Sequence, residues 1–239
     1  MIDGKIVYLS GGVGGAKLAL GLDRVLAPGQ LTVIANTGDD FHHLGLFVCP
    51  DIDTLVYTLS GEADTTQGWG RQGETGNFMS AHAALGGEDW FFLGDKDLAM
   101  HVRRTGMLAA GMTLTEVTGK LAGHLGIKSH ILPMSDDPAP TIVQTEDGPL
   151  AFQHYFVRDR AAPAVRRLDL HGGEVPPGMS PQVVDALADP DLAAIIIGPS
   201  NPYISIDPIL QVPGMMELIT GRDVPRIVVS PIVGGDAVK

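Results

Sequence analysis

The feature that most constrains the fold of this chain is a short apolar run that leads directly into a glycine-packed turn. Residues 7–17 read VYLSGGVGGAK, with four glycines between the apolar run and the next helical pattern. Glycine lets the backbone approach a ligand closely, and the N-terminus of a following helix attracts anions. The order strand, glycine turn, helix therefore predicts an α/β protein with a phosphate-sized loop at one end of its sheet.

Apolar patterning along the rest of the chain alternates between strand-like and helix-like segments. Strands are expected at 6–9, 31–35, 129–133, 141–145, 150–157, 192–197 and 226–230, and helices at 16–26, 51–59, 97–110, 113–125 and 181–188. This alternation predicts a single α/β domain over residues 1–239, with a Rossmann-like, mainly parallel sheet and helices on both faces. Residues 126–180 are richer in strands and prolines and indicate a smaller inserted strand-rich region. Residues 60–76 are polar and glycine-rich, which is typical of a surface excursion or of a lid over a site.

Composition excludes several classes of protein. The net charge of −12 repels a phosphate backbone, so we expect no nucleic-acid partner. No apolar run approaches the ~18 residues that a membrane helix needs, and the first residues lack the pattern of a signal peptide. The one cysteine, Cys49, rules out an internal disulfide and is expected to be buried and inert. These features favour a cytoplasmic protein without a membrane partner.

A second turn carries adjacent carboxylates. Residues 36–40 read NTGDD after the strand at 31–35, and Asp51 and Asp53 open the helix that follows. The carboxyl ends of neighbouring parallel strands converge, so these acids are expected to lie near the glycine turn. Two carboxylates with substrate oxygens and water suit Mg²⁺. The alternative is that Asp51 or Asp53 only caps its helix.

The glycine turn matches no standard nucleotide fingerprint. It cannot be written as a P-loop, and Lys17 stands where the third glycine of a dinucleotide-binding motif belongs. Its candidate ligand-binding residues are Gly12, Val13, Gly14, Gly15 and Lys17. The alternative is a tight strand-to-helix turn that binds nothing.

Two further segments carry polar residues at positions where α/β proteins bind ligands. Asp97, His101 and Arg104 fall on one face of the helix expected at 97–110. Lys96 or Arg104 is a candidate for gripping a phosphate or carboxylate, although the charge order along this helix also suits its dipole alone. Ser200 and Asn201 follow the strand at 192–197 and are candidates for nucleotide contacts, with a plain turn at Asn201 as the alternative.

Taken in order, these segments resemble the 2-phospholactate transferases of deazaflavin coenzyme biosynthesis. The segments are SGGVGGAK, NTGDD, CPDIDT, LGDKDLAMH, LPMSDDP, GPSNP and SPIVGG. The resemblance extends over essentially all 239 residues. Family members usually continue for some tens of residues beyond the last segment, so the resemblance implies a C-terminal part that is absent from this chain.

The resemblance implies a reaction. The donor is guanosine diphosphate that carries a phospholactyl-type group, derived from 2-phospholactate, phosphoenolpyruvate or phosphoglycerate. The ribityl hydroxyl of the deazaflavin Fo attacks the outer phosphorus and GMP leaves, which gives the core of coenzyme F(420). The resemblance also implies Mg²⁺ and a homodimer.

The same resemblance suggests roles for the candidate residues. Asp39 with Asp51 or Asp53 would hold Mg²⁺, and Asp53, if not on the metal, would orient or deprotonate the hydroxyl. The remaining assignments are the Gly12–Gly15 amides and Lys17 for the donor phosphates, Asn36 for substrate, Ser200 and Asn201 for the guanosine nucleotide, and Lys96 or Arg104 for the acyl group. A related family of nucleotide-sugar-binding regulators has a similar start and is the alternative function.

Overall fold

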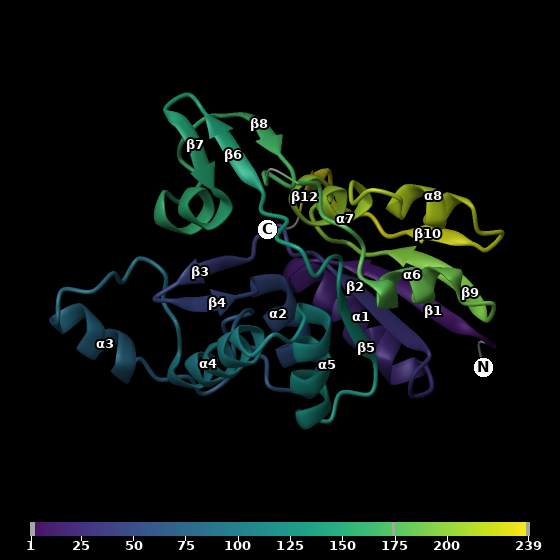
Figure 1. Cartoon of the computed structure of the whole chain (residues 1–239), viewed down its shortest axis with the longest axis horizontal. Coiled ribbons are helices and arrows are strands. Elements are labelled where there is room, and N and C mark those ends of the chain that lie inside the picture. Colours follow the sequence, from purple (N-terminus) through teal and green to yellow (C-terminus); the bar gives the residue numbers. More distant parts are fainter. Residues whose placement is uncertain (1–2, 174, 238–239) are drawn as a thin grey trace.

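A five-stranded parallel sheet forms the centre of the molecule. The computed structural model describes residues 3–173 and 175–237. The strands lie in the order β10-β9-β1-β2-β5 (Figure 1). Their bounds are β1 Lys5–Ser10, β2 Leu31–Ala35, β5 His130–Pro133, β9 Leu192–Ile197 and β10 Arg226–Val228. The predicted α/β fold with a mainly parallel sheet is confirmed.

Helices cover both faces of this sheet, as the sequence predicts. In β1, Ile6 and Tyr8 point into one buried cluster, while Val7 and Leu9 point into the other. This alternation is the period-two pattern of a strand that is buried on both sides. The first cluster includes residues of α1 (Gly12–Val25), α2 (Pro50–Ser60), α4 (Asp95–Ala109) and α5 (Leu114–His124). The second includes residues of α6 (Pro181–Ala188), α7 (Asp207–Leu210) and α8 (Met215–Thr220).

Several elements escape the sequence analysis. β3 (Phe41–His43) and β4 (Leu46–Val48) form an antiparallel hairpin between β2 and α2. Leu44 and Gly45 turn this hairpin at φ values of 52° and 76°, a backbone that favours glycine or asparagine and is unusual for leucine. The sequence also does not predict helix α3 (Asn77–Ala84), helices α7 and α8, strand β8 (Val165–Asp169), the single helical turns η1 (His154–Arg158) and η2 (Pro202–Ile206), or the small hairpin of β11 (Ile232–Val233) and β12 (Asp236–Ala237).

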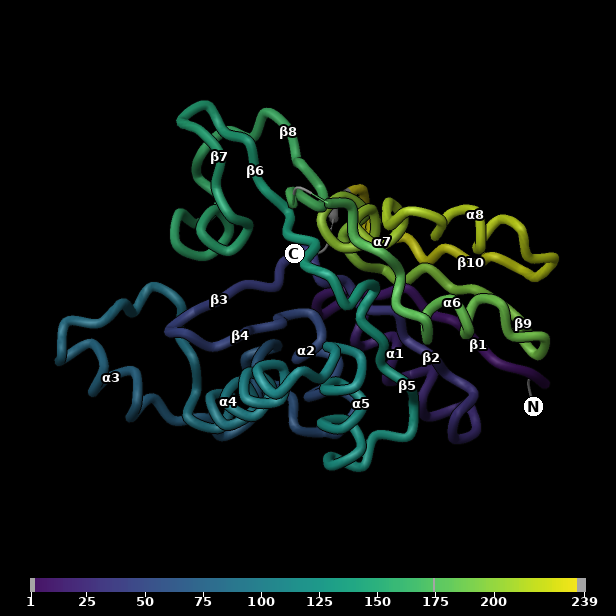
Figure 2. Tube along the Cα trace, viewed as in Figure 1, coloured from purple at the N-terminus to yellow at the C-terminus, as the bar shows by residue number. Residues whose placement is uncertain are grey.

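The strand-rich region forms its own antiparallel sheet. β6 (Ile142–Thr145), β7 (Gly148–Ala151) and β8 (Val165–Asp169) lie in the order β7-β6-β8 and project from the main sheet (Figures 1 and 2). The strand expected at 150–157 is wrong beyond Ala151. The ladder ends where Ile142, the first residue of β6, pairs with Ala151, so the chain loses its partner there and coils into η1.

The order of the strands places a ligand site at a defined edge. From β1 the chain moves outward through β2 to β5 on one side, whereas β9 and β10 lie on the other side of β1. The strand order therefore reverses between β1 and β9, and α/β proteins bind ligands outside the carboxyl ends of strands at such a point. Both the glycine turn after β1 and the GPSNP segment after β9 begin at this edge. In the part of the chain that the structure describes, no helix is long and apolar enough to cross a membrane.

Candidate active site

The turns after β1 and β9 are joined by Ser200. The Gly11 N–H donates to Ser200 Oγ at 3.0 Å, and the same hydroxyl donates to the Gly11 carbonyl at 2.6 Å. A Cβ at Gly15 would lie 2.5 Å from Ser200 Oγ, and one at Gly11 would lie 2.5 Å from Asp51 Oδ2. Glycine is required at both positions because Ser200 and Asp51 approach the backbone of the turn too closely to leave room for a side chain.

Asp51 lies directly against the glycine turn. Its Oδ1 accepts a hydrogen bond from the Gly12 N–H at 2.6 Å, and its Oδ2 accepts one from Asn36 Nδ2 at 2.9 Å. These bonds join the start of α1, the end of β2 and the start of α2. The Asp51 side chain thus binds the N-terminus of α1 rather than capping its own helix.

Asp39 is the second carboxylate of this cluster. Asn36 Nδ2 also reaches Asp39 Oδ1 at 3.5 Å, and Gln153 Nε2 reaches Asp39 Oδ2 at 3.4 Å. One amide group therefore lies between two buried carboxylates. Burial raises the pKa of Asp39 well above its usual value, and repulsion from Asp51 and Asp40 acts in the same direction. Burial likewise raises the pKa of Asp51 to about 6.

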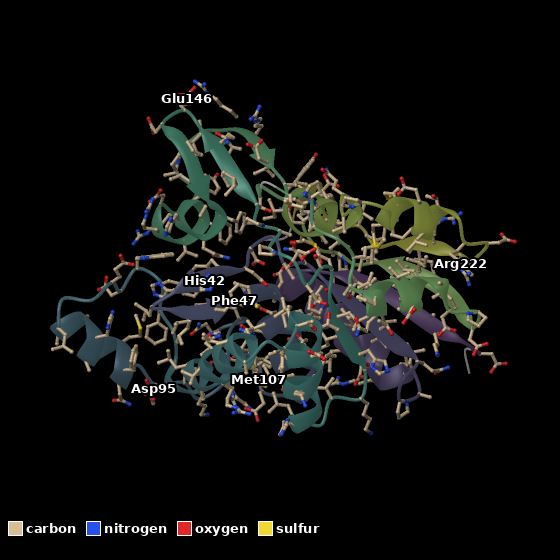
Figure 3. The ribbon with its side chains drawn as sticks, in the orientation of Figure 1. His42, Phe47, Asp95, Met107, Glu146 and Arg222 are labelled. Carbon is tan, nitrogen blue, oxygen red and sulfur yellow. The ribbon has the colours of Figure 1, made fainter. Side chains whose placement is uncertain are left out.

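Asp53 is engaged in a buried ion pair. Arg104 Nη1 donates to Asp53 Oδ2 at 3.1 Å, and Nη2 donates to Asp53 Oδ1. Nη1 also approaches the carbonyl of Phe47, a residue labelled in Figure 3, at 3.3 Å. Only 1% of Arg104 is exposed. The guanidinium of Arg104 therefore binds Asp53 and the backbone in the protein interior, and it is not exposed to a substrate.

The cluster has the chemistry of a divalent cation site that is completed by substrate. Within residues 3–173 and 175–237, no Lys, Arg or His forms an ion pair with Asp39 or Asp51. Both carboxylate oxygens of Asp40 are buried, and the Cys49 thiol interacts with this carboxylate as a weak donor. Adjacent buried carboxylates repel each other unless a cation or a proton intervenes. No group of three His, Cys, Asp or Glu side chains among the described residues forms a complete metal cage. Mg²⁺ typically takes one or two carboxylates together with phosphates and water, so the residues present fit Mg²⁺.

The remaining candidate residues lie around this cluster or away from it. Lys17 is exposed on α1 and, with Val13, lines a cavity of about 570 Å³ between α1, α2 and residues 61–70. Lys96 Nζ donates to the Gln72 carbonyl at 3.0 Å, so its observed contact is outside the carboxylate cluster. Asn201 Oδ1 accepts from the N–H groups of Tyr203 and Ile204, which gives it a role in the turn that begins η2.

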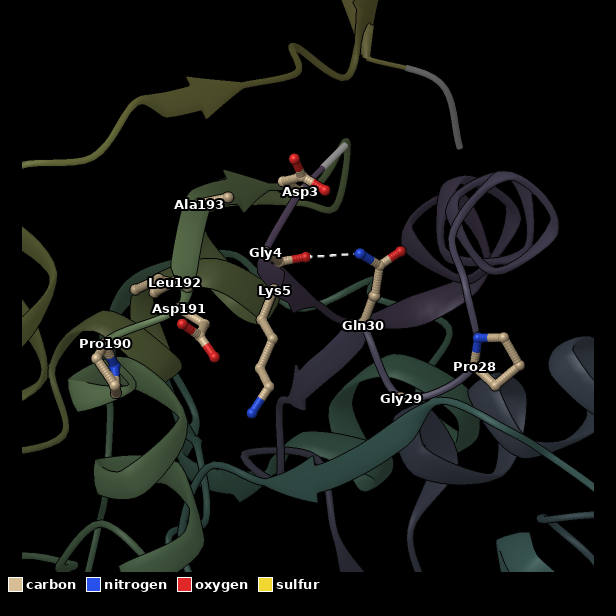
Figure 4. Close-up of a pocket in the computed structure, with 10 residues that line it drawn as sticks. All are labelled: Asp3, Gly4, Lys5, Pro28, Gly29, Gln30, Pro190, Asp191, Leu192 and Ala193. Atoms are coloured by element: carbon tan, nitrogen blue, oxygen red, sulfur yellow. Dashed lines mark hydrogen bonds between the residues drawn. The ribbon is translucent and has the colours of Figure 1, made fainter. Parts of the chain in front are cut away.

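A second cavity lies at the opposite edge of the sheet. It measures about 540 Å³ and is lined by residues at the amino ends of β1 and β9 and by the turn before β2 (Figure 4). In it, Gln30 Nε2 donates to the Gly4 carbonyl at 2.9 Å. The glycine turn and the carboxylates are at the carboxyl ends of the strands, so this cavity is separate from the candidate active site.

Two residues of the cluster were not selected from the sequence. Asp40 is adjacent to Asp39 in the sequence but has no role in the predicted site, and Gln153 falls within the strand expected at 150–157. A glutamine inside an apolar strand pattern is a signal that a polar partner is near, and here that partner is Asp39. The chain turns into η1 where the sequence predicts a continuous strand, and this turn brings Gln153 to the cluster.

The raised pKa of Asp51 predicts a pH dependence of stability. A carboxyl whose pKa is about 6 in the folded protein and lower in the unfolded chain stabilises the fold at low pH and loses that contribution as the pH rises through 6. In metal-free protein, Asp51→Asn is therefore expected to gain stability relative to wild type between pH 5 and pH 7.5, by roughly 5 °C in Tm. Thermal unfolding of both proteins across this range measures the gap, and a gap that stays constant with pH contradicts the assignment.

Comparison with known proteins identifies similar sequences. The family model described as "2-phospho-L-lactate transferase CofD" matches residues 6–238. A phosphoenolpyruvate transferase from Streptomyces coelicolor is 43% identical over 98% of this chain and 74% of its own length. A 2-phospho-L-lactate transferase from Methanosarcina mazei is 39% identical over 98% of this chain and 76% of its own length.

A solved structure shares the fold. The crystal structure of protein BH3568 from Bacillus halodurans superposes with a TM-score of 0.67 at 20% sequence identity, over 95% of this chain and 68% of that one. At this identity the likeness concerns the arrangement of the helices and strands only.

Proposed function

The chain belongs to the 2-phospho-L-lactate transferase family CofD, and we propose that it transfers a phospholactyl-type group from a guanosine diphosphate-linked donor to the ribityl hydroxyl of Fo in coenzyme F(420) biosynthesis. One structural observation supports this function above the others. Two buried carboxylates, Asp39 and Asp51, share the amide of Asn36 beside a glycine turn and have no cationic partner among the described residues. Such a site suits a diphosphate that arrives with a divalent cation.

The reaction requires positioning and charge neutralisation more than covalent catalysis. The ribityl oxygen forms a bond to the outer phosphorus of the donor and loses its proton to solvent, while the bond from that phosphorus to the bridging oxygen breaks and GMP leaves. The Gly12 N–H is bound to Asp51, and the N–H groups of the next residues of α1, 13–15, would bind the donor phosphates at the switch point. Ser200 holds the β1 and β9 loops together, and this bond keeps the two walls of the nucleotide site in register.

Asp39 and Asp51 are the proposed ligands of Mg²⁺. The ion, when bound, neutralises the diphosphate and the charge that develops on the leaving GMP. Asp53 is bound to Arg104 through both of its oxygens, and an ion-paired carboxylate is a poor base. We therefore assign to Asp53 the orientation of the ribityl hydroxyl rather than its deprotonation. A homodimer in the cytoplasm is the assembly that we propose on the same family grounds.

Lys17 provides a test of the donor site. Lys17 is exposed on the second turn of α1, in the helix whose N-terminus we propose as the donor phosphate site. Lys17→Ala is expected to raise the KM for the donor about tenfold, the loss of one charged contact, with little change in stability because the side chain is exposed. Steady-state kinetics with varied donor at saturating Fo measure the effect. If the donor kinetics do not change, Lys17 has no part in donor binding.

The overall function is tested by product analysis. Purified protein with Mg²⁺, Fo and an equimolar mixture of 2-phospholactate, phosphoenolpyruvate and phosphoglycerate, each joined to GMP through a diphosphate, should release GMP and form a phosphodiester of Fo. Mass spectrometry of the product identifies which donor is preferred. A protein that forms no Fo phosphodiester from any of the three donors contradicts the proposed function.

A further inference from the structure

Three side chains on one face of α4 lie in a row that begins at the candidate active site. Arg104, His101 and Asp97 follow each other along this face at helical spacing. His101 is 1% exposed and lies directly behind Arg104. His101 has no role in the reaction proposed above, although it contacts the guanidinium of Arg104, which binds Asp53.

The contact with Arg104 determines the protonation of the imidazole. Arg104 Nη1 lies 3.2 Å from His101 Nδ1. A guanidinium nitrogen can only donate a hydrogen bond, so Nδ1 accepts and the single ring proton is on Nε2. Nε2 has no hydrogen-bond partner among the described residues and lies 3.9 Å from Asp97 Oδ1. His101 is therefore a neutral imidazole with a defined tautomer.

Two carboxylates, Asp53 and Asp40, are possible partners of Arg104. Arg104 is bound to Asp53, and its charge also lowers the pKa of Asp40, which burial raises. Arg104 Nε is buried without a hydrogen-bond acceptor in the described part of the chain, and the buried carboxylate of Asp40 has the Cys49 thiol as a weak donor. A guanidinium N–H is a much stronger donor than a thiol, so Asp40 is an alternative partner to which the guanidinium could turn from Asp53.

The imidazole favours one of these arrangements. Nη1 meets Asp53 Oδ2, His101 Nδ1 and the Phe47 carbonyl at 3.1, 3.2 and 3.3 Å. Turning the guanidinium toward Asp40 would break the bond to Nδ1, which is costly for a buried ring nitrogen. The other polar group that Nδ1 faces among the described residues is Asp53 Oδ2 at 3.7 Å, which is an acceptor and lies beyond hydrogen-bond distance. His101 therefore stabilises the orientation in which Arg104 holds Asp53.

We propose that His101 is a positioning residue of the transferase, which keeps Arg104 on Asp53 and away from Asp40. The inference rests on the proposed function, since Asp53 is there the group that orients the acceptor hydroxyl. Its effect is expected on the chemical step, because the donor is held by the glycine turn at the end of β1 rather than by α4.

Two substitutions at one position separate positioning from packing. His101→Leu keeps an apolar side chain but removes the acceptor, whereas His101→Asn retains an acceptor oxygen near the place of Nδ1. His101→Leu is expected to lower kcat by about 10- to 100-fold, a typical cost of losing a group that orients a functional residue, with the KM for the donor within about threefold. His101→Asn should recover most of the lost kcat. His124→Leu, on the exposed end of α5, is the control and should behave as wild type.

Equal losses of kcat in His101→Leu and His101→Asn, or no loss in either, overturn the inference. If the wild-type protein makes no product, the proposed function is refuted, and kcat can no longer test the role of His101. Two further measurements therefore test that role without turnover. In wild-type protein, ¹⁵N NMR should find the His101 proton on Nε2, and a proton on Nδ1 overturns the inference. A crystal structure of His101→Leu should have Arg104 turned toward Asp40, and an unchanged Arg104–Asp53 pair overturns it.

Discussion

Asp39→Asn is expected to lower kcat by about 100-fold or more while raising the stability of the metal-free protein. The carboxylate is a proposed Mg²⁺ ligand, and removing a group that stabilises charge in the transition state costs this much. Stability should rise because the amide has nearly the same shape but no charge, and this gain should exceed the loss of one of the two long hydrogen bonds from Asn36 and Gln153. The amide therefore escapes the burial and the repulsion from Asp51 and Asp40 that raise the pKa of Asp39.

The two opposite effects make this prediction specific. Turnover at increasing Mg²⁺ measures the loss of kcat, and thermal unfolding with a chelator measures the gain in stability. Added Mg²⁺ should stabilise the wild-type protein more than the variant, because the ion binds the native state. Asp89→Asn, which removes an exposed carboxylate outside the cluster, is the control and should change neither. Near-normal rates of Asp39→Asn at saturating Mg²⁺ would show that Asp39 is not a ligand.

Arg104→Met is expected to produce the largest loss of stability. Arg104 is the one cation that the described residues bring into ion-pair contact with Asp53 at full burial, and it also offsets part of the charge of Asp40. Removing one member of a buried ion pair leaves an uncompensated charge and costs about 3–5 kcal/mol. For a chain of this length the Tm should fall by roughly 10 °C.

The pH dependence of this loss identifies its cause. If unpaired carboxylates destabilise the variant, they will take up protons as the pH falls, and the gap in Tm between variant and wild type will narrow from pH 8 to pH 5. Arg103→Met is a matched control, since Arg103 is the exposed neighbour on the same helix, and it should cost little. A gap that is independent of pH would indicate lost packing rather than unpaired charge.

The sequence was sufficient to predict the central sheet because its signals are local. Each of the strands β1, β2 and β9 is a buried apolar run, and each is followed by a turn of polar or small residues. The grouping of Asp97, His101 and Arg104 on one face was also predictable, because helical spacing alone determines it.

The partners of these residues were not predictable from local patterns. Nothing in the spacing of Arg104 indicates that it binds Asp53, 51 positions earlier. The pairing depends on how α2 and α4 pack, and the hairpin β3–β4 that separates Asp40 from α2 turns at Leu44 and Gly45 without a typical hairpin signal. Gln153 reaches Asp39 only because β7 ends at Ala151, and a strand pattern does not reveal where its partner strand stops.

The structure also revises the interpretation of residues 60–76. An unsupported surface excursion does not describe this segment, since Ala63 and Arg71 pair in a β-bridge and Arg71 forms an ion pair with Glu62. The guanidinium of Arg71 also lies over the ring of Tyr57 in α2. The segment is thus attached to α2, which carries Asp51 and Asp53 at its other end.

The central claim is that the carboxyl ends of β1 and β2 gather a guanosine diphosphate and a divalent cation into one site. A crystal structure of the protein with GDP and Mg²⁺ tests this most directly. We expect the ion on Asp39 and Asp51, with the diphosphate against the N–H groups of residues 13–15. A well-ordered nucleotide or ion bound elsewhere, for example in the cavity at the amino ends of β1 and β9, would contradict it.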